Sequence, residues 1–455
     1  MHENVSRGTP DTIAAIATPL GHGGIGVVRV SGAQVPAVLR GVLGKPINAR
    51  FASHCTFLDT DGTVIDEGIG LYFRAPNSYT GEEVLELQGH GGPAVLARVL
   101  MRCVELGARL ARPGEFTERA FLNGKLDLAQ AESVVDLIEA ASAEAAKSAA
   151  RTLTGEFSRR VNQLTDALVD LRMHVEACID FPEEEIDPAD RAAQQVKLQH
   201  VRAMLDDLTR EARLGAVLRD GLTAVLIGRP NVGKSSLLNC LAGEDVAIVT
   251  PVAGTTRDHV RATIHIEGVP IHLIDTAGLR DTDDAVEEIG IARTWAAIEK
   301  AGAALIIMEA GEMAGQKEAE ILQRMSKDIP KAWVYNKIDL YAGSGVSRET
   351  SRDGNDVHLH VSALKGEGID PLRAWLLEKA GWRPGGEGVF LARARHLAAL
   401  RQAEAHLQQA FFRAEQFELF AEELRLAQQA LASITGEFTT DDLLGEIFSR
   451  FCVGK

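Results

Sequence analysis

The sequence has few cysteines, few aromatic residues and no long apolar run. Its 455 residues include 5 cysteines, none in a C-x-x-C pair, and 5% aromatic residues. An odd, sparse set of cysteines is typical of free thiols in a reducing compartment and argues against a disulfide framework or a zinc site. No run of about 18 apolar residues occurs, so no transmembrane helix is predicted. We therefore expect a cytoplasmic protein without membrane attachment.

An excess of positive charge is also missing. The chain carries 48 basic and 64 acidic side chains, a formal net charge of −16. Residues 1–125 are neutral, whereas 126–220 carry −8, 221–380 carry −6 and 381–455 carry −2. This balance argues against a general electrostatic nucleic-acid binder. An anionic ligand is least disfavoured in the N-terminal quarter.

The first part of the chain predicts a small α+β domain. At roughly 150 residues per domain, the length suggests about three domains. Residues 11–125 mix short apolar runs with glycine-rich turns, which is typical of short strands and a few helices. Residues 25–30 and 84–87 are predicted strands, and residues 89–92 are predicted to form a tight loop.

The rest of the chain predicts an α/β domain between two helical regions. Residues 126–220 have apolar positions at helical spacing, interrupted by an acidic stretch between Pro182 and Pro188 that we interpret as a solvated turn rather than a metal site. Residues 221–380 alternate strands and helices, which is typical of a parallel sheet. Residues 381–455 are helical again. The simplest arrangement is one discontinuous helical domain with the α/β domain inserted into it.

A phosphate-binding motif follows the first strand of the predicted α/β domain. The sequence Gly228-Arg229-Pro230-Asn231-Val232-Gly233-Lys234-Ser235-Ser236 fits the pattern G-x-x-x-x-G-K-[ST]. In this pattern backbone N–H groups surround the phosphates, the lysine reaches the terminal phosphates, and the serine hydroxyl coordinates Mg²⁺.

Three more motifs follow later predicted strands and point to GTP. They are Asp275-Thr276-Ala277-Gly278, Asn336-Lys337-Ile338-Asp339 and Ser362-Ala363-Leu364. The first supplies an aspartate and a glycine close to the terminal phosphate. The aspartate of the second is suited to the N1 and N2 protons of guanine, and the third supports the base. Ordered motifs at the carboxyl ends of strands predict a P-loop GTPase.

The hydrolytic part of the site departs from the Ras pattern. Ras-like proteins orient the attacking water with a glutamine, and Leu279 occupies that position here, so another group must do so. Between the P-loop and Asp275 lies Thr250-Pro251-Val252-Ala253-Gly254-Thr255-Thr256-Arg257-Asp258. We expect one of its threonines to complete the Mg²⁺ shell; the alternative is an ordinary solvated turn.

These motifs, together with both ends of the chain, resemble the tRNA-modification GTPase family called MnmE or TrmE. The N-terminal resemblance rests on segments that include Leu85-Glu86-Leu87-Gln88-Gly89-His90-Gly91-Gly92 and Arg112-Pro113-Gly114-Glu115-Phe116. The C-terminal resemblance rests on Cys452-Val453-Gly454-Lys455, which is similar to the family's C-x-G-K ending. The match covers the whole chain in order.

The resemblance implies a three-domain architecture and a coupled activity. It implies a folate-binding, dimerising domain (1–125), a discontinuous helical domain (126–220 and 381–455) and a Ras-like P-loop G domain (221–380). It implies K⁺-dependent GTP hydrolysis coupled to adding a carboxymethylaminomethyl-type group at carbon 5 of the wobble uridine of certain tRNAs. It also implies Mg²⁺, K⁺, 5-formyltetrahydrofolate or a related folate, a homodimer, and an MnmG (GidA)-type partner that carries FAD.

The resemblance also assigns roles to single residues. Asn231 is implied to ligate K⁺, with Thr250, Val252 and Thr255, and Thr256 to join Ser235 on Mg²⁺. Glu287 is similar to the glutamate that positions water, although an exposed helical acid is the alternative. The folate is expected to contact Arg29, Glu86, Lys125 and Lys455. The full predicted GTP set comprises Asn231, Val232, Gly233, Lys234, Ser235, Ser236, Thr250, Pro251, Val252, Ala253, Gly254, Thr255, Thr256, Asp275, Thr276, Ala277, Gly278, Asn336, Lys337, Asp339, Ser362 and Ala363.

Cys452 is open to several interpretations. An ordinary frayed terminus is one, and prenylation is another, although Gly454 and Lys455 do not fit a prenylation signal. The resemblance favours a functional thiol near the folate, and its chemical role does not follow from the sequence.

Two other functions compete with this hypothesis. A ribosome-assembly switch that binds rRNA would share only the G domain, and such proteins usually carry a basic RNA-binding module. Residues 381–455 are net acidic and lack one. A folate-binding scaffold with incidental nucleotide turnover is the third interpretation. Because no segment offers a basic RNA track, we predict that the flavoprotein partner supplies most of the tRNA affinity.

Overall fold

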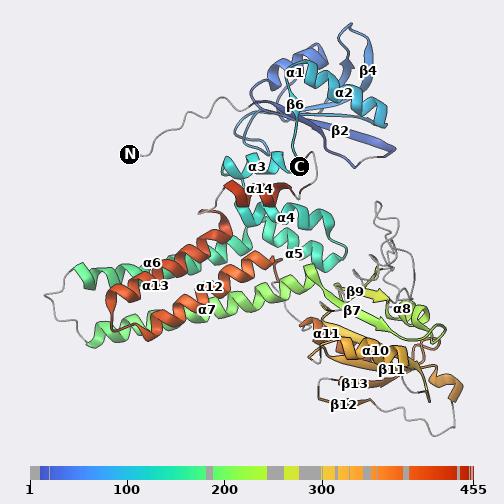
Figure 1. Cartoon of the computed structure of the whole chain (residues 1–455). Helices are drawn as coiled ribbons and strands as arrows, with labels where there is room; N and C mark the ends of the chain where they lie inside the picture. Colours follow the sequence, from blue (N-terminus) through green and yellow to red (C-terminus); the bar gives the residue numbers. More distant parts are fainter. Residues whose placement is uncertain are drawn as a thin grey trace. The chain divides into compact units, whose positions relative to one another are not determined.

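The computed structural model contains an N-terminal α+β domain, a set of long helices and a second, mostly parallel α/β domain (Figure 1). By contacts between Cα atoms the chain separates into two compact units, residues 1–135, 152–195 and 405–455 in one and 136–151 and 196–404 in the other. The structure describes residues 11–19, 21–180, 188–242, 261–275, 299, 301–312, 316–326, 328–341, 350–354, 356–382, 389–437, 441–449, 451 and 454.

The N-terminal domain is built on a six-stranded sheet. Its strand order is β3-β4-β5-β2-β1-β6, antiparallel except for the short parallel pair of β1 with β6. Side chains alternate along the strands, so that Val28, Val30, Leu85 and Leu87 point into the core. The strands are β1 (Ile13–Ile16), β2 (Gly23–Ser31), β3 (Ser53–Leu58), β4 (Val64–Phe73), β5 (Val84–Gly91) and β6 (Arg109–Leu110).

Two helices cover one face of this sheet. Helix α1 (Val35–Leu43) ends at Gly44 in the left-handed conformation, and helix α2 (Pro93–Glu105) starts with a proline, which suits a first helical turn. Both bury an apolar stripe against the sheet. The predicted tight loop at residues 89–92 is wrong in part, because β5 continues to Gly91.

The extension of β5 depends on glycines that allow close approach. Gly89 and Gly91 lie opposite Gly26 and Gly23 of β2. A Cβ on Gly91 would lie 2.6 Å from the carbonyl oxygen of Gly23, and one on Gly89 would lie 2.3 Å from Asp66 Oδ2. The glycines that suggested a loop therefore serve strand pairing instead.

Most of the chain that precedes and follows the second sheet in the sequence is helical. In the first unit, α6 and α13 pack along one another, and Arg172 of α6 donates to Gln428 of α13. The described part of the chain has no helix long and apolar enough to cross a bilayer. The helices are α3 (Glu115–Leu122), α4 (Leu128–Glu139), α5 (Ala143–Leu153), α6 (Glu156–Asp180), α7 (Pro188–Asp220), α12 (Ala394–Phe412), α13 (Phe417–Thr435) and α14 (Asp441–Ser449).

The second sheet has seven strands in the order β12-β13-β11-β10-β7-β9-β8. The five inner strands are parallel and the two edge strands are antiparallel to their neighbours. The alternation of strands and helices predicted for residues 221–380 is confirmed: the apolar runs at residues 222–227, 271–274, 303–308, 332–335 and 357–361 form five of the strands, to within one or two residues. The strands are β7 (Leu222–Ile227), β8 (Arg261–Ile266), β9 (Val269–Asp275), β10 (Ala303–Glu309), β11 (Lys331–Asn336), β12 (Ser351–Asp353) and β13 (Asp356–His360).

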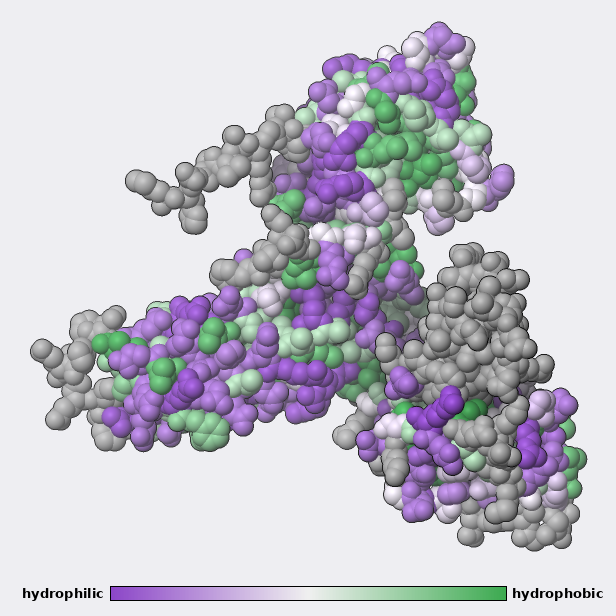
Figure 2. Space-filling model, in the orientation of Figure 1, coloured by the Kyte–Doolittle hydropathy of each residue, from purple (hydrophilic) through white to green (hydrophobic). Residues whose placement is uncertain are grey.

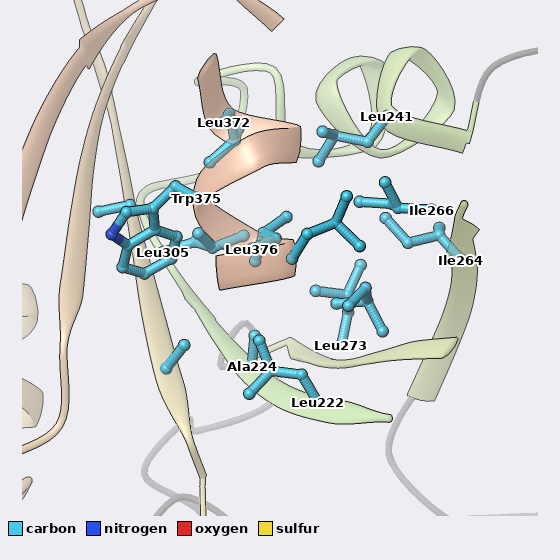
Figure 3. Packing of buried hydrophobic residues seen from close by; sticks show 14 of the residues in the cluster. Leu222, Ala224, Leu241, Ile264, Ile266, Leu273, Leu305, Leu372, Trp375 and Leu376 are labelled. Atoms are coloured by element: carbon cyan, nitrogen blue, oxygen red, sulfur yellow. The ribbon is translucent and has the colours of Figure 1, made fainter. Parts of the chain in front are cut away.

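Helices cover both faces of the second sheet. Leu241 of α8 (Lys234–Ala242) and Leu372, Trp375 and Leu376 of α11 (Ile369–Ala380) pack on one face (Figure 3). On the other face, α10 (Gln316–Arg324) packs over side chains of β10 and β11. Burial on both faces explains the continuous apolar runs of these strands.

Candidate functional sites

The carboxyl ends of the parallel strands bring the P-loop and the base-binding motifs to one edge of the second sheet. The P-loop leaves β7 at Gly228 and enters α8 at Lys234. Asn231 and Gly233 have φ angles of 66° and 93°, the left-handed conformation that this tight loop requires. A Cβ on Gly233 would lie 2.3 Å from Asn336 Nδ2, so this position also needs glycine for space.

The predicted phosphate-binding side chains start helix α8. Lys234 Nζ donates to the carbonyl oxygen of Gly228 at 2.9 Å, which holds the ammonium beside the loop. Ser235 and Ser236 are exposed in the first turn. Backbone N–H groups at a helix N-terminus attract anions, and the Ser235 hydroxyl is an oxygen ligand of the kind Mg²⁺ prefers. The residues present therefore fit a phosphate and Mg²⁺.

Asn336 joins three loops of the predicted site. Its side chain is 2% exposed. Nδ2 donates to the carbonyl oxygen of Val232 at 2.9 Å, and Oδ1 accepts from the backbone N–H of Ala363 at 3.1 Å. Because one buried amide links the P-loop, the end of β11 and the loop after β13, these loops are held in fixed register.

The carboxylate predicted to recognise the base, that of Asp339, already accepts one hydrogen bond within the protein. Asp339 lies in the short 3-10 helix Ile338–Tyr341 and accepts a hydrogen bond from Ser362 Oγ at 2.6 Å. This bond lowers the pKa of Asp339, which is therefore ionised at neutral pH. Such a carboxylate can accept two hydrogen bonds from the N1 and N2 protons of a guanine.

One neighbour of this site was missed by the sequence reasoning. Glu309, the last residue of β10, accepts from Lys337 Nζ at 2.8 Å and from the Tyr341 hydroxyl at 3.2 Å. Only its place at a strand end, beside the strand that carries Asn336, could have suggested it.

Much of the predicted catalytic part lies outside the described residues. Asp275 is the last residue of β9, at the same sheet edge as the P-loop. Asn231, the one predicted K⁺ ligand within the described chain, is exposed in the P-loop. The predicted site residues that lie outside the described ones are Thr250, Pro251, Val252, Ala253, Gly254, Thr255, Thr256, Thr276, Ala277, Gly278 and Glu287, together with Cys452 and Lys455; the predicted acidic turn before Pro188 also lies outside them.

A second cluster lies on the N-terminal sheet, around Arg29. Arg29 of β2 and Glu86 of β5 are directly opposite one another, and Arg29 Nε donates to Glu86 Oε1 at 2.9 Å. Both side chains are about four-fifths buried. The structure therefore brings together two of the four residues predicted to bind folate.

Two aromatic rings flank this arginine. The guanidinium carbon of Arg29 lies 5.5 Å from the ring centre of Tyr79 and 5.8 Å from that of Phe116. Both are within cation–π range. Tyr79 was not predicted, and nothing in its sequence context marks it. Phe116 stands in a segment that carried the family resemblance but received no role there.

The end of the chain reaches the same cluster. Arg29 Nη1 lies 3.4 Å from the carbonyl oxygen of Gly454. Gly454 has a φ of 96°, and a Cβ there would lie 2.4 Å from the carbonyl oxygen of Ile16. Phe451 packs on Phe448 of α14, with its Cβ 2.9 Å from a Cβ placed at Gly114. The residues that flank the predicted thiol are thus anchored on the N-terminal domain.

Lys125 lies beside the loop that carries Tyr79. Its Nζ donates to the carbonyl oxygen of Pro76 at 3.1 Å, and its Cγ is 3.3 Å from a Cβ placed at Gly81. The exposed ammonium is free to turn toward an anionic group at the rim of the cluster.

The N-terminal domain also contains a buried ionic network. Glu115 of α3 is 2% exposed and accepts from Arg109 Nη1 at 2.8 Å and from Arg119 Nη2 at 3.1 Å. These arginines outweigh the effect of burial and lower the pKa of Glu115 to about 2. The network fixes the start of α3, the helix that follows Gly114.

Comparison with known proteins extends over both clusters. Residues 12–125 match the family model "GTP-binding protein TrmE N-terminus", and residues 128–452 match the model "MnmE helical domain". The chain is 58% identical to tRNA modification GTPase MnmE of Thiobacillus denitrificans over 98% of both chains, and 58% identical to that of an Azoarcus species over 98% of both. The chain belongs to the MnmE family of tRNA modification GTPases.

The whole-chain match decides between two of the earlier hypotheses. The MnmE of Nitrosomonas europaea is likewise 57% identical over 98% of this chain and 99% of its own. Among solved structures, that of Era from Aquifex aeolicus is 27% identical, covers 41% of this chain and 66% of its own, and has a TM-score of 0.25. The rRNA-binding alternative requires likeness in the G domain alone, and the MnmE relatives match from end to end.

Proposed function

We propose that this MnmE-family GTPase is stimulated by K⁺ and drives tRNA modification. With an FAD-containing MnmG (GidA)-type partner, it adds a carboxymethylaminomethyl-type group at carbon 5 of the wobble uridine of certain tRNAs, using a one-carbon unit from a folate. The observation that carries the GTPase part is the buried Asn336 amide, which holds the P-loop and both base-binding loops together.

The residues of the sheet edge divide the work of binding GTP. Asp339 selects guanine, Lys234 moves from the Gly228 carbonyl to the terminal phosphates, and Asp275 stands at the end of the adjacent strand. When bound, Mg²⁺ neutralises charge that develops on the phosphates. Two protein ligands are proposed for Mg²⁺. Ser235 lies within the described residues, and Thr256 lies outside them.

The proposed hydrolytic residues are Glu287, which orients water, and the K⁺ ligands Asn231, Thr250, Val252 and Thr255. A cation held beside the phosphates would replace the arginine finger of other GTPases. Asn231 supports this assignment because it stands exposed in the P-loop with a φ of 66°, a conformation that asparagine adopts more readily than most residues.

The folate is proposed to bind beside Arg29. Glu86 can accept hydrogen bonds from an amino-substituted ring, Tyr79 and Phe116 can flank one, and Lys125 and Lys455 can pair with carboxylates. Support comes from Gly454, which brings the C-terminal segment to Arg29. Cys452, the proposed functional thiol, precedes Gly454 by two residues in the sequence.

The proposed partners follow from the surface. The N-terminal domain exposes Ile25 (70%), Phe51 (64%), Val64 (60%) and Ile69 (39%), and Figure 2 shows hydrophobic atoms gathered on its surface. Such side chains suit the proposed homodimer through residues 1–125. The net charge of −16 supports a tRNA contact supplied largely by the flavoprotein.

The four described cysteines, Cys55, Cys103, Cys178 and Cys240, are free thiols, which suits a cytoplasmic location. The proposed domain limits remain 1–125, 126–220 with 381–455, and 221–380.

The test compares GTP hydrolysis in KCl and NaCl at equal ionic strength. We expect clearly faster hydrolysis in KCl, and we expect Asn231→Ala to remove the difference between the salts. Arg40→Ala, an exposed change at the end of α1, serves as the control. Equal rates in the two salts would contradict the K⁺ part of the proposal and leave the GTPase assignment intact.

A further inference from the structure

The base-binding motif contains a lysine whose ammonium is held by a carboxylate from a neighbouring strand. Glu309 ends β10, opposite Asn336 of β11, and the backbone N–H of Ala310 donates to the Asn336 carbonyl at 2.8 Å. Glu309 is therefore built into the same sheet edge as the motif. Its carboxylate accepts from Lys337 Nζ at 2.8 Å.

The same carboxylate is held from a second side. Tyr341, at the end of the 3-10 helix, donates its hydroxyl to Glu309 Oε1 at 3.2 Å. Lys337 precedes Asp339 by two residues and Tyr341 follows it by two. Glu309 therefore contacts the short turn that carries Asp339 on both sides of that residue.

The backbone explains why the lysine needs such a partner. Lys337 has a φ of 65°, and its carbonyl accepts from the N–H of Leu340 at 3.0 Å, so it stands at the start of the turn that presents Asp339. A lysine has a flexible four-carbon stem and no preferred direction without a partner. Without Glu309, the ammonium of Lys337 would have a second carboxylate nearby, that of Asp339 two residues along the chain, which is anionic as well.

Pairing of the lysine with Asp339 would obstruct base recognition. Asp339 now accepts from the neutral Ser362 hydroxyl, a donor that a base can replace or accompany. An ammonium would be a much stronger competitor for the same oxygens. A carboxylate elsewhere that captures the ammonium keeps Asp339 available.

We infer that Glu309 is a positioning residue for guanine recognition, which holds Lys337 away from Asp339 and fixes the lysine stem beside the base. Tyr341 orients the carboxylate. The inference rests on the proposed GTP site and deepens it, because it names a specificity-determining residue outside the four nucleotide-binding motifs. Both carboxylate and ammonium are about one-quarter to one-third exposed, so the pair has a moderate effect on binding.

The test measures dissociation constants for GDP and for IDP, which lacks the 2-amino group that Asp339 is proposed to bind. For Glu309→Ala we expect the Kd for GDP to rise about 3- to 10-fold, with a smaller rise for IDP, because the site loses its discrimination at Asp339. Glu309→Gln keeps an oxygen acceptor. Its Kd for GDP should therefore lie between that of the unaltered protein and that of Glu309→Ala. KM for GTP should rise by a larger factor than kcat falls.

The control is Glu312→Ala, which removes an exposed carboxylate three residues along the chain. It should leave both dissociation constants within twofold of those of the unaltered protein, and all variants should unfold at similar temperatures. An unchanged Kd for GDP in Glu309→Ala, or equal losses for GDP and IDP, would overturn the inference. Failure of the unaltered protein to bind GDP would overturn the GTPase assignment and this inference with it.

Discussion

The two candidate sites are assembled from the sequence in opposite ways. At the edge of the parallel sheet, each binding group lies within a few residues of a strand end, as Gly228, Asn336 and Ser362 do. In the N-terminal domain, Arg29 meets a partner 57 residues away and a second one 425 residues away. The first site depends on local motifs, and the second on long-range closure of the chain.

This difference decides what the sequence could predict. Parallel strands place their carboxyl ends together, so motifs after successive apolar runs predicted the nucleotide site and its sheet. No spacing rule links residue 29 with residue 454. Family resemblance alone assigned Arg29 and Lys455 to one folate site, and neither the contact with Gly454 nor Tyr79 was predicted.

Some residue patterns in the sequence are compatible with two structures, and one of them led to a wrong prediction. The glycines at residues 89–91 suggested a loop, yet they allow strand β5 to lie close to β2 and Asp66. Glu309 was missed for the opposite reason, because an acidic residue at a strand end has no distinctive pattern. In both cases the neighbouring strand, which a single sequence does not reveal, decides the role.

The largest expected effect is at the strand-end site. Asp339→Asn should weaken GTP binding by roughly 100-fold or more, because a site built around a carboxylate acceptor is left with a donor facing the guanine N–H groups. The same variant should gain affinity for XTP, whose oxygen at C2 accepts from the new amide. Titration with both nucleotides checks this, and unchanged GTP affinity would show that Asp339 does not contact the base.

The second prediction concerns a change that disrupts only the site around Arg29. Arg29→Ala should weaken 5-formyltetrahydrofolate binding by roughly 10- to 100-fold, since charge-assisted hydrogen bonds contribute about 1.5–3 kcal/mol. GTP affinity should remain within twofold, because the two sites lie in separate compact units. Calorimetry with each ligand measures both, and Arg40→Ala is the matched control. Unaltered folate affinity would rule out this location.

A third change tests the scaffold of the N-terminal site. Glu115→Gln should destabilise the protein by about 2 kcal/mol at pH 7, because the buried Arg119 and the partly exposed Arg109 lose a charged partner. In the folded protein the pKa of Glu115 is about 2, below the ordinary glutamate value of 4.5. The difference should therefore be complete above pH 4.5 and shrink as the pH falls toward 2.

Urea unfolding at pH 7 and at lower pH measures this difference. Glu118→Gln, in the same helix, removes a carboxylate that pairs with the exposed Arg112 and should cost less stability. A Glu115→Gln penalty that did not depend on pH would show that the charge of Glu115 contributes nothing to stability.

The smallest effect tests closure by the C-terminal segment. Gly454→Ala should weaken folate binding about tenfold, because a side chain at a φ of 96° is strained and meets the Ile16 carbonyl. Gly445→Ala is the control, since a Cβ there would meet nothing within 4 Å. Equal folate affinities in the two variants would mean that the terminus does not shape the site.

The central claim is that GTP turnover and the Arg29 cluster serve one modification reaction. The most direct measurement is mass spectrometry of wobble-uridine nucleosides from cells that lack the protein and are supplied with the unaltered chain, Asp339→Asn or Arg29→Ala. The unaltered chain should restore the carboxymethylaminomethyl-type nucleoside and both variants should fail, although Arg29→Ala still hydrolyses GTP. Normal levels of that nucleoside with Arg29→Ala would contradict the account.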